Sequence, residues 1–359
     1  MEPYRTSHVQ SDQRQLGRRT ADELRSHAET HPHHAVEHGL SLPRIVGHQV
    51  LPDGSKFFCP ASAATAPPCP ATAPQLPLIN PNFSQIQWVT TPGWGIYHGL
   101  QLGLQKRLSR GLQFGAGYTW SKNMSSVDQQ FGGEVQNQLV GPMDLEDLAR
   151  DYSLSLFHQS HVFNVNGKYQ MPWDRLLTSG VSRMILGGWE INTNWRATSG
   201  LPQVIGAGFN VSRNRHVLAA DRPNLTPGFK NYVTSGVTAG CPGVAAGQKL
   251  GTSSLFYDPC AYSLPLAGTY GNLVRNALIG PGLFNINVGL VKNTPLTAVR
   301  EGMNLEFRAE AFNLFNHANF RQPAAAIFSA NGARNPNAGR ITATSVDNRQ
   351  LQLGLKLTF

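Results

Sequence analysis

Apolar and polar residues alternate along the chain in seven segments between residue 96 and the C-terminus. In the last segment, Leu351, Leu353, Leu355, Leu357 and Phe359 occupy one set of alternate positions, and polar residues or glycine occupy the other. Because successive side chains of a β-strand point to opposite faces, this period of two predicts strands with one apolar and one polar face. The segments with this pattern are residues 96–107, 112–121, 161–171, 189–199, 284–291, 303–313 and 349–359.

The connections between these segments alternate between short and long. Residues 108–111 and 292–302 form short links, whereas residues 122–160, 200–283 and 313–340 form long loops. Segments of roughly nine to twelve residues suit a tilted crossing of a bilayer. Short turns at one side and long loops at the other are typical of outer-membrane barrels. The pattern therefore predicts an all-β fold: an antiparallel transmembrane β-barrel of about seven strands, with long external loops and short periplasmic turns.

The polar faces of these segments carry charged residues that would be costly in a dry core, because each would need a buried partner. In a barrel they would face a wet lumen, while aromatic residues near the strand ends, such as Trp120 and Trp189, would form an interfacial girdle. A soluble antiparallel sheet with one wet face is the alternative. We favour the barrel, because strand length, loop asymmetry and the terminal strand agree. The predicted lumen residues are Lys168, Glu190, Arg196, Glu306, Arg308 and Glu310.

These lumen charges have two interpretations. They could contact a plug or line a substrate path, or they could form a structural network inside the barrel. We favour the structural network.

Composition changes this picture little. Hydrophobic residues make up 40% of the chain and charged residues 14%, and the 36 glycines and 24 prolines indicate many turns. A charged fraction of 14% lies well below the quarter that is usual in soluble domains. The net charge of +9 is scattered rather than gathered in a basic and aromatic patch, so we expect no nucleic-acid partner. No stretch has the eighteen or so consecutive apolar residues of a membrane-spanning helix.

The first part of the chain has a different character. Residues 1–49 are rich in His and Arg and are expected to be a poorly ordered leader without a signal peptide, with a short helix near residues 20–29. Residues 50–94 contain many prolines and are expected to form an external loop. The barrel strands are expected within residues 95–359.

The four cysteines fall in two pairs within loops rich in Pro, Gly and Ala. Cys59 lies near Cys69, and Cys241 lies near Cys260, and neither pair has the Cys-x-x-Cys spacing of zinc or redox sites. We favour two loop disulfides in an oxidising compartment over free thiols.

Other candidate chemistry is weak. His31, His33, His34 and His38 form a cluster that could bind a metal, but Pro32 breaks helical spacing, and we favour a solvated tract. Neither a Gly-x-Ser-x-Gly elbow nor a His-Glu-x-x-His motif occurs. We therefore expect no enzymatic activity, no metal and no cofactor.

Several stretches resemble the C-terminal part of TonB-dependent outer-membrane receptors of the Oar-like type, which carry a carboxypeptidase-regulatory-like N-terminal domain. They are "YHGLQLGLQKRLSRGLQFGAGYTWSKNM", "GGWEINTNWRATSGLP", "YDPCAYSLPLAGTYGNLVRNALIGPGLFNINVGLVKN", "LEFRAEAFNLFNHANF" and "GRITATSVDNRQLQLGLKLTF". With residues near 51–58 and 80–86, the likeness covers most of residues 50–359, whereas residues 1–49 show no clear match.

The resemblance implies a barrel of twenty-two strands around a plug, energised through a TonB box. We find neither plug nor TonB box and about a third of the strands, so we expect a fragment that would need a plug from outside the chain to contact the TonB system. Its expected function is nutrient uptake at the cell outer membrane. A structural or adhesive outer-membrane β-protein and a soluble β-rich binding protein remain alternatives.

The C-terminal residue has an expected role of its own. Phe359 resembles the C-terminal aromatic signal by which the barrel assembly machinery recognises outer-membrane proteins. The resemblance thus implies outer-membrane lipid and this machinery as partners.

Overall fold

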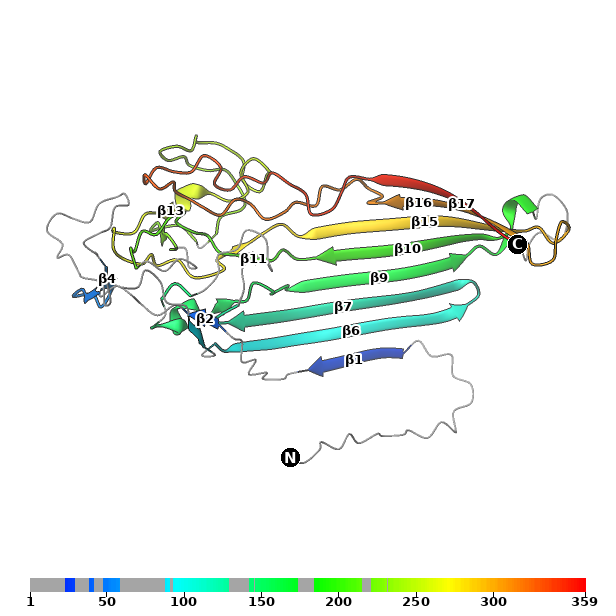
Figure 1. The fold of residues 1–359 in the computed structure, drawn as a ribbon, viewed down its shortest axis with the longest axis horizontal. Helices are drawn as coiled ribbons and strands as arrows, with labels where there is room; N and C mark the ends of the chain where they lie inside the picture. Colours follow the sequence, from blue (N-terminus) through cyan, green and yellow to red (C-terminus); the bar gives the residue numbers. More distant parts are fainter. Residues whose placement is uncertain are drawn as a thin grey trace, which may run out of the picture.

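A computed structural model shows the chain as a broad antiparallel sheet with folded loops at one end (Figure 1). Helix is scarce in the described residues, and η1 (Leu148–Asp151) and η2 (Pro259–Ala261) are short 3-10 turns. Among the described residues, no helix is long and apolar enough to cross a membrane. The structure describes residues 23–29, 39–41, 48–58, 88–90, 93–128, 142–144, 146–173, 184–214, 221–230 and 232–359.

The main sheet has nine strands in the order β1-β6-β7-β9-β10-β15-β16-β17, with β8 (Ser153–Leu154) paired to β7. All pairings are antiparallel. Seven of its strands lie where the alternation predicts them. They are β6 (Gly95–Ser109), β7 (Leu112–Ser125), β9 (His161–Gln170), β10 (Trp189–Thr198), β15 (Leu283–Pro295), β16 (Asn304–Phe312) and β17 (Gln350–Thr358).

Strand β1 (Glu23–Glu29) is a correction. The sequence predicted a short helix near residues 20–29, but this segment pairs antiparallel with β6, from Glu23 opposite Gln105 to Glu29 opposite Gly99. The free edge of β6 offers unpaired N–H and C=O groups, and helix preference over so few residues is weak. Backbone pairing with the edge of β6 therefore outweighs the local helix propensity, and the segment is a strand.

The register gives the sheet one apolar and one polar face. One row of directly opposed residues is mainly apolar and the next is polar, as the alternation predicts. The apolar row runs Leu112, Tyr169, Ile191, Leu290, Ala309 and Leu353. The polar row runs Gln113, Lys168, Asn192, Gly289, Glu310 and Gln352.

The β6–β7 turn shows how short links are made at the end where the chain terminates. Arg110 and Gly111 both have positive φ, 51° and 84°. This is the backbone that a two-residue hairpin turn requires, and glycine adopts it without steric cost. A Cβ at Gly111 would also lie 2.5 Å from the carbonyl oxygen of Gln170, so the turn packs closely against the end of β9.

The long loops gather at the opposite end of the sheet from the C-terminus (Figure 1). We call their described parts, residues 126–128, 142–144, 146–160, 199–214, 221–230, 232–282 and 313–349 together with residues 48–58, the loop cap. Its small sheets are β11 (Pro202–Gln203) with β14 (Leu278–Ile279), β12 (Asn224–Leu225) with β13 (Tyr262–Ser263), and β3 (Gln49–Val50) with β4 (Lys56–Phe57). A further pair joins β2 (Gly39–Ser41) to β5 (Trp88–Thr90).

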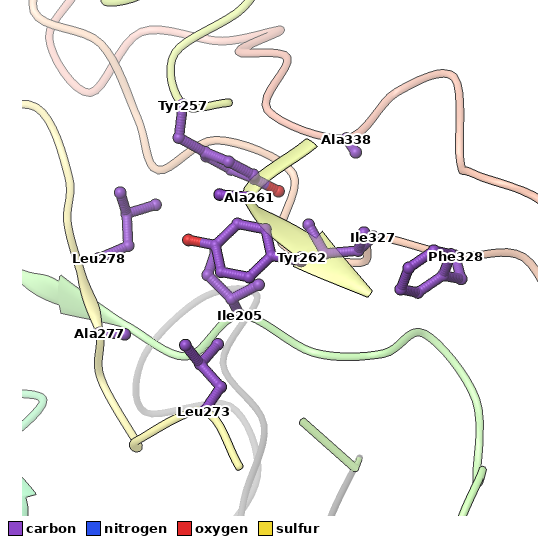
Figure 2. Packing of buried hydrophobic residues seen from close by; sticks show 10 residues of the cluster. All are labelled: Ile205, Tyr257, Ala261, Tyr262, Leu273, Ala277, Leu278, Ile327, Phe328 and Ala338. Carbon is purple, nitrogen blue, oxygen red and sulfur yellow. The ribbon is translucent and has the colours of Figure 1, made fainter. Parts of the chain in front are cut away.

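The hydrophobic core cluster lies in the loop cap rather than against the sheet (Figure 2). Tyr257 and Tyr262 meet edge to face, with ring centroids 6.0 Å apart, and the Tyr257 hydroxyl donates to the carbonyl of Ala324 at 2.6 Å. Ile205 and Ile327 from two different loops complete the centre. Packing between loops, rather than a second sheet layer, therefore fixes the cap.

Candidate functional site: the loop cap and the sheet faces

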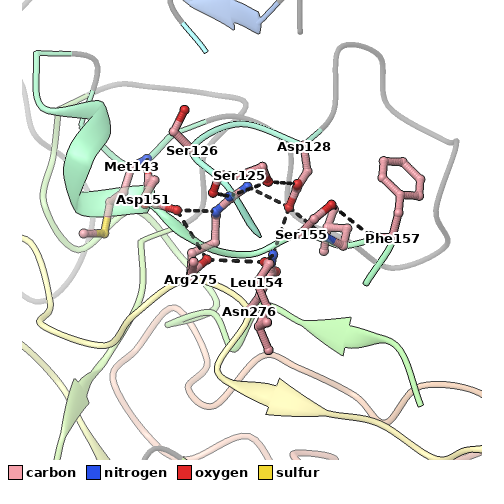
Figure 3. A network of polar contacts seen from close by, with 12 residues as sticks. Ser125, Ser126, Asp128, Met143, Asp151, Leu154, Ser155, Phe157, Arg275 and Asn276 are labelled. Atoms are coloured by element: carbon pink, nitrogen blue, oxygen red, sulfur yellow. Dashed lines mark hydrogen bonds and ion pairs between the residues drawn. The ribbon is translucent and has the colours of Figure 1, made fainter. Parts of the chain in front are cut away.

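Arg275 is the centre of a buried polar network in the loop cap (Figure 3). Its Nη1 lies 2.8 Å from Oδ2 of Asp128, and its Nε donates to the carbonyl of Asp151 at 2.8 Å. Its Nη2 donates to the carbonyl and the hydroxyl of Ser125. One guanidinium thus binds the end of β7 and the segment before β8, although 147 residues separate it from Asp128.

Asp128 accepts hydrogen bonds from three further groups. Its Oδ2 accepts from the backbone N–H of Leu156 at 2.8 Å and from the side-chain amide of Asn276 at 2.9 Å, and its Oδ1 accepts from the hydroxyl of Ser125. A buried carboxylate is tolerated when it is paired and its remaining lone pairs are satisfied. The network therefore holds the β7–β9 loop and the β10–β15 loop in one arrangement.

A second buried ion pair lies beside the first. Nη1 of Arg222 lies 2.5 Å from Oδ1 of Asp151, and both side chains are almost completely buried. Oδ2 of Asp151 accepts from the backbone N–H of Met143 at 2.7 Å, and Nε of Arg222 donates to the carbonyl of Leu273 at 2.8 Å. The two ion pairs share Asp151, because its carbonyl binds Arg275, so they form one connected unit.

Asp221 is a buried carboxyl next to this unit. It accepts from the backbone N–H and, at 3.0 Å, from the hydroxyl of Ser212. Burial raises the pKa of Asp221 to about 6, although the hydrogen bonds from Ser212 and the charge of Arg222 act in the opposite direction. The raised pKa of about 6 brings the protonation change of Asp221 toward neutral pH.

A disulfide joins two parts of the β10–β15 loop. Cys241 and Cys260 are bonded, with Cα atoms 5.7 Å apart. The bond connects a small hairpin, bridged between Val237 and Lys249, to η2. Closing a loop of this size contributes about 3 kcal/mol in the chain-entropy model. Cys59 and Cys69 lie outside the described residues.

The six charged residues predicted for the lumen share one face of the sheet. Nζ of Lys168 on β9 lies 2.6 Å from Oε2 of Glu190 on the adjacent strand β10. Nε of Arg308 lies 2.5 Å from Oε1 of Glu306 on the same strand, β16. Register places the other two on the same face. Arg196 is opposite Asn164 and Asn285, and Glu310 is opposite Gly289 and Gln352.

The opposite face exposes large apolar side chains. The exposed fractions of Leu351, Leu353 and Leu355 are 75%, 73% and 72%, and that of Phe359 is 79%. Exposed contiguous apolar surface of this kind marks a contact with a membrane or a partner. Phe359 directly follows β17, at the end of the sheet away from the loop cap (Figure 1).

The buried cap network was missed by reasoning from the sequence. Arg222 and Arg275 stand in loops without any periodic pattern, and their acidic partners are distant in sequence. The one available signal was that Arg275 falls within "YGNLVRNALIGPG", a stretch that carries the family resemblance although it lies in a long loop.

The described residues hold no group of three or more metal-ligating side chains. His31, His33, His34 and His38 lie outside the described part of the chain, so the interpretation of this cluster stays a prediction.

Comparison with known proteins agrees with the alternating strands and the loop arrangement. A search of the curated proteins found no match. The family model described as "Outer membrane beta barrel domain" matches residues 37–352, which include all of β6 to β16 and the beginning of β17. A barrel of this kind lies in the outer membrane, with lipid against its apolar face. The chain belongs to the outer membrane β-barrel domain family.

Proposed function

We propose that the chain forms the C-terminal part of a TonB-dependent outer-membrane receptor that takes up a large or scarce nutrient. The loop cap would capture the nutrient, and the polar face of the sheet would line the lumen. A plug domain that is not among the described residues would fill the lumen and contact TonB. The observation that carries this proposal is the folding of the long loops into one body at a single end of the sheet.

A folded cap supports capture at low concentration. Loops that order only on binding pay conformational entropy at that moment, and a preformed surface avoids this cost. The ion pairs of Arg275 with Asp128 and of Arg222 with Asp151 hold the loops together without ligand. The cap is therefore arranged as a preformed outer surface.

The C-terminal residue and the two sheet faces also have roles in this receptor. Phe359 is the residue that the barrel assembly machinery recognises, and the leucines of β17 contact lipid. The polar-face residues, such as Lys168 and Glu190, form a structural network in the lumen. The chain has no enzymatic role, cofactor or nucleic-acid partner in this proposal.

The test is growth of an in-frame deletion strain on limiting nutrients. Cells without the gene, cells complemented with it and cells lacking TonB are grown with iron chelates, nickel, cobalamin, oligosaccharides or peptides as the limiting source. We expect the gene deletion to impair growth on at least one source, and the TonB deletion to cause the same defect. Complementation should restore growth in the first strain alone.

The alternative is a structural or adhesive outer-membrane protein. In that case growth is normal on every source, whereas attachment of cells to surfaces falls on deletion. That result would overturn the transport proposal but leave the outer-membrane barrel intact.

A further inference from the structure

The β6–β7 hairpin extends beyond β9 at the cap end of the sheet, where the short strand β8 pairs with Met124 and Ser125. Pairing of β7 with β9 runs from Leu112 opposite Tyr169 to Trp120 opposite His161, which is the first residue of β9. Strand β7 continues to Ser125, still paired with β6. Ten residues of β9 span about 33 Å at 3.3 Å each, or about 25 Å of height at the tilt of such barrels. The apolar band of an outer-membrane barrel is also about 25 Å tall, so β9 spans this band. The extension of β6 and β7 beyond β9 therefore lies at the outer boundary of the apolar band.

The apolar face changes character at this boundary. Leu100 is opposite Trp120 on this face, and the next pair outwards on the same face is His98 opposite Lys122. Trp120 is 56% exposed, and His98 and Lys122 are exposed as well. Trp120 thus lies at the outer end of the apolar band, and His98 and Lys122 lie just beyond it.

His98 and Lys122 are directly opposed across β6 and β7. Side chains directly opposite in an antiparallel pair have Cβ atoms about 5 Å apart, and like charges there are destabilising. In the described part of the chain, neither His98 nor Lys122 forms an ion pair, and the neighbours of Lys122 on its own face of β7 are Trp120 and Met124. A bound anion would pair with the ammonium group of Lys122 and accept a hydrogen bond from an imidazole N–H of His98.

The charge of Lys122 also acts on a buried histidine nearby. His158 is buried near Lys122, and its pKa is lowered, first by burial and then by the charge of Lys122. Its Nδ1 accepts from the backbone N–H of Asn123 at 3.2 Å, and its Nε2 lies 3.0 Å from the hydroxyl of Ser160. His158 is thus a hydrogen-bonded structural residue of the loop cap, whereas His98 and Lys122 lie on the exposed face.

We propose that His98 and Lys122, above Trp120, bind the phosphate headgroup of an anionic lipid in the outer leaflet of the outer membrane. The basic pair binds the phosphate oxygens, and Trp120 lies against the acyl boundary beneath. The occupant is a lipid rather than free phosphate, because the pair stands directly above a continuous apolar face. The proposal rests on the outer-membrane location and is independent of transport.

The test compares variants of the full chain purified from outer membranes. Wild type, the double variant His98→Gln/Lys122→Gln and the control Lys106→Gln are placed in phosphatidylcholine nanodiscs that contain diphosphoryl lipid A. Lys106 is a matched control, because it lies on the same face of β6 but at the opposite end of the strand. Lipid retained on the protein is counted by native mass spectrometry.

We expect the double variant to retain lipid A at least about fivefold more weakly, because loss of the Lys122 charge alone corresponds to about 1 kcal/mol. The control Lys106→Gln should bind as wild type does. Lys122→Arg should also bind as wild type, which separates charge loss from misfolding. Heat-modifiable migration checks that each variant is folded.

Three outcomes would overturn the proposal. One is equal retention by the double variant and wild type, and another is equal retention of lipid A and its fully dephosphorylated form. The third is complete displacement of lipid A by inorganic phosphate, which would identify a free anion as the occupant.

Discussion

Burial decides how much each charged residue contributes to stability. Arg275 is buried and binds Asp128, Asp151 and Ser125, whereas Arg308 pairs with Glu306 on an exposed face. Removing one partner of a buried ion pair leaves the other charge without compensation, which costs far more than breaking an exposed pair. Two arginines in ion pairs thus contribute differently to stability, more in the buried cap and less on the exposed sheet.

We predict that Arg275→Met destabilises the loop cap by about 3–5 kcal/mol, because Asp128 would stay buried without its cation. Native-state hydrogen exchange at Asn276 and Leu278 measures this as faster opening of the cap. The control Arg308→Met should leave exchange in the cap unchanged. Equal effects of the two substitutions would contradict the assigned role of the network.

The second prediction at this scale concerns pH. The pKa of Asp221 is raised to about 6 in the folded cap, from 3.8, so the folded state binds this proton more tightly than the unfolded state. The resulting stabilisation is fully present below the unfolded value of 3.8 and is lost as pH rises through about 6. Cap stability should therefore decrease between pH 4 and pH 7 by up to about 3 kcal/mol from this group.

Asp221→Asn isolates that contribution. The variant should lose the part of the pH dependence that belongs to Asp221. The measurement is the difference between the wild-type and variant opening free energies at several pH values. A difference that does not change with pH would show that Asp221 is not responsible.

At the scale of elements, the two faces of each barrel strand differ in whether they tolerate a charged side chain. Leu353 stands in the apolar row and Gln352 in the polar row of the same strand, so adjacent residues meet different surroundings. This difference follows from the period of two, because neighbouring side chains point to opposite faces.

We predict that Leu353→Arg lowers the amount of folded protein in the outer membrane, because a cation near the bilayer midplane costs about 2–4 kcal/mol. Gln352→Arg, one residue earlier, should be tolerated. The heat-modifiable fraction of outer-membrane protein measures both. The reverse order of effects would mean that the faces are assigned the wrong way round.

At the scale of the whole molecule, the sheet ends at β1 and β17, and no pairing joins these two strands in the described residues. Unpaired backbone N–H and C=O groups are too costly in hydrocarbon for an open edge to persist there. We therefore predict that both edges of the sheet are paired in the membrane.

Pairing of both sheet edges in the membrane has a direct consequence for the backbone of β17. Alternate N–H groups of β17 bond to β16, and the others point away from it. In the outer membrane we expect both sets to be protected from hydrogen exchange, because both would be paired in a closed barrel. Rapid exchange of the outward set in intact membranes would contradict closure.

Sequence reasoning succeeded where structure depends on neighbouring residues. The seven strands, their faces and the positions of short and long connections follow from alternation, which requires only that each strand have one apolar environment. It failed for β1, where the free edge of β6 decided between helix and strand. The family model supports the outer-membrane barrel, whereas the Oar-like receptor type stays a proposal.

The sequence by itself thus determined the strands, including the terminal one from Gln350 to Thr358. Each strand is recognised from the alternation of apolar and polar residues within one continuous stretch of the chain. Only the tertiary structure decided that the long loops form one cap around Arg275 and a core containing Tyr257. Those contacts join residues more than a hundred positions apart. Their pairing depends on how the sheet brings the loops to one end, which no local pattern encodes.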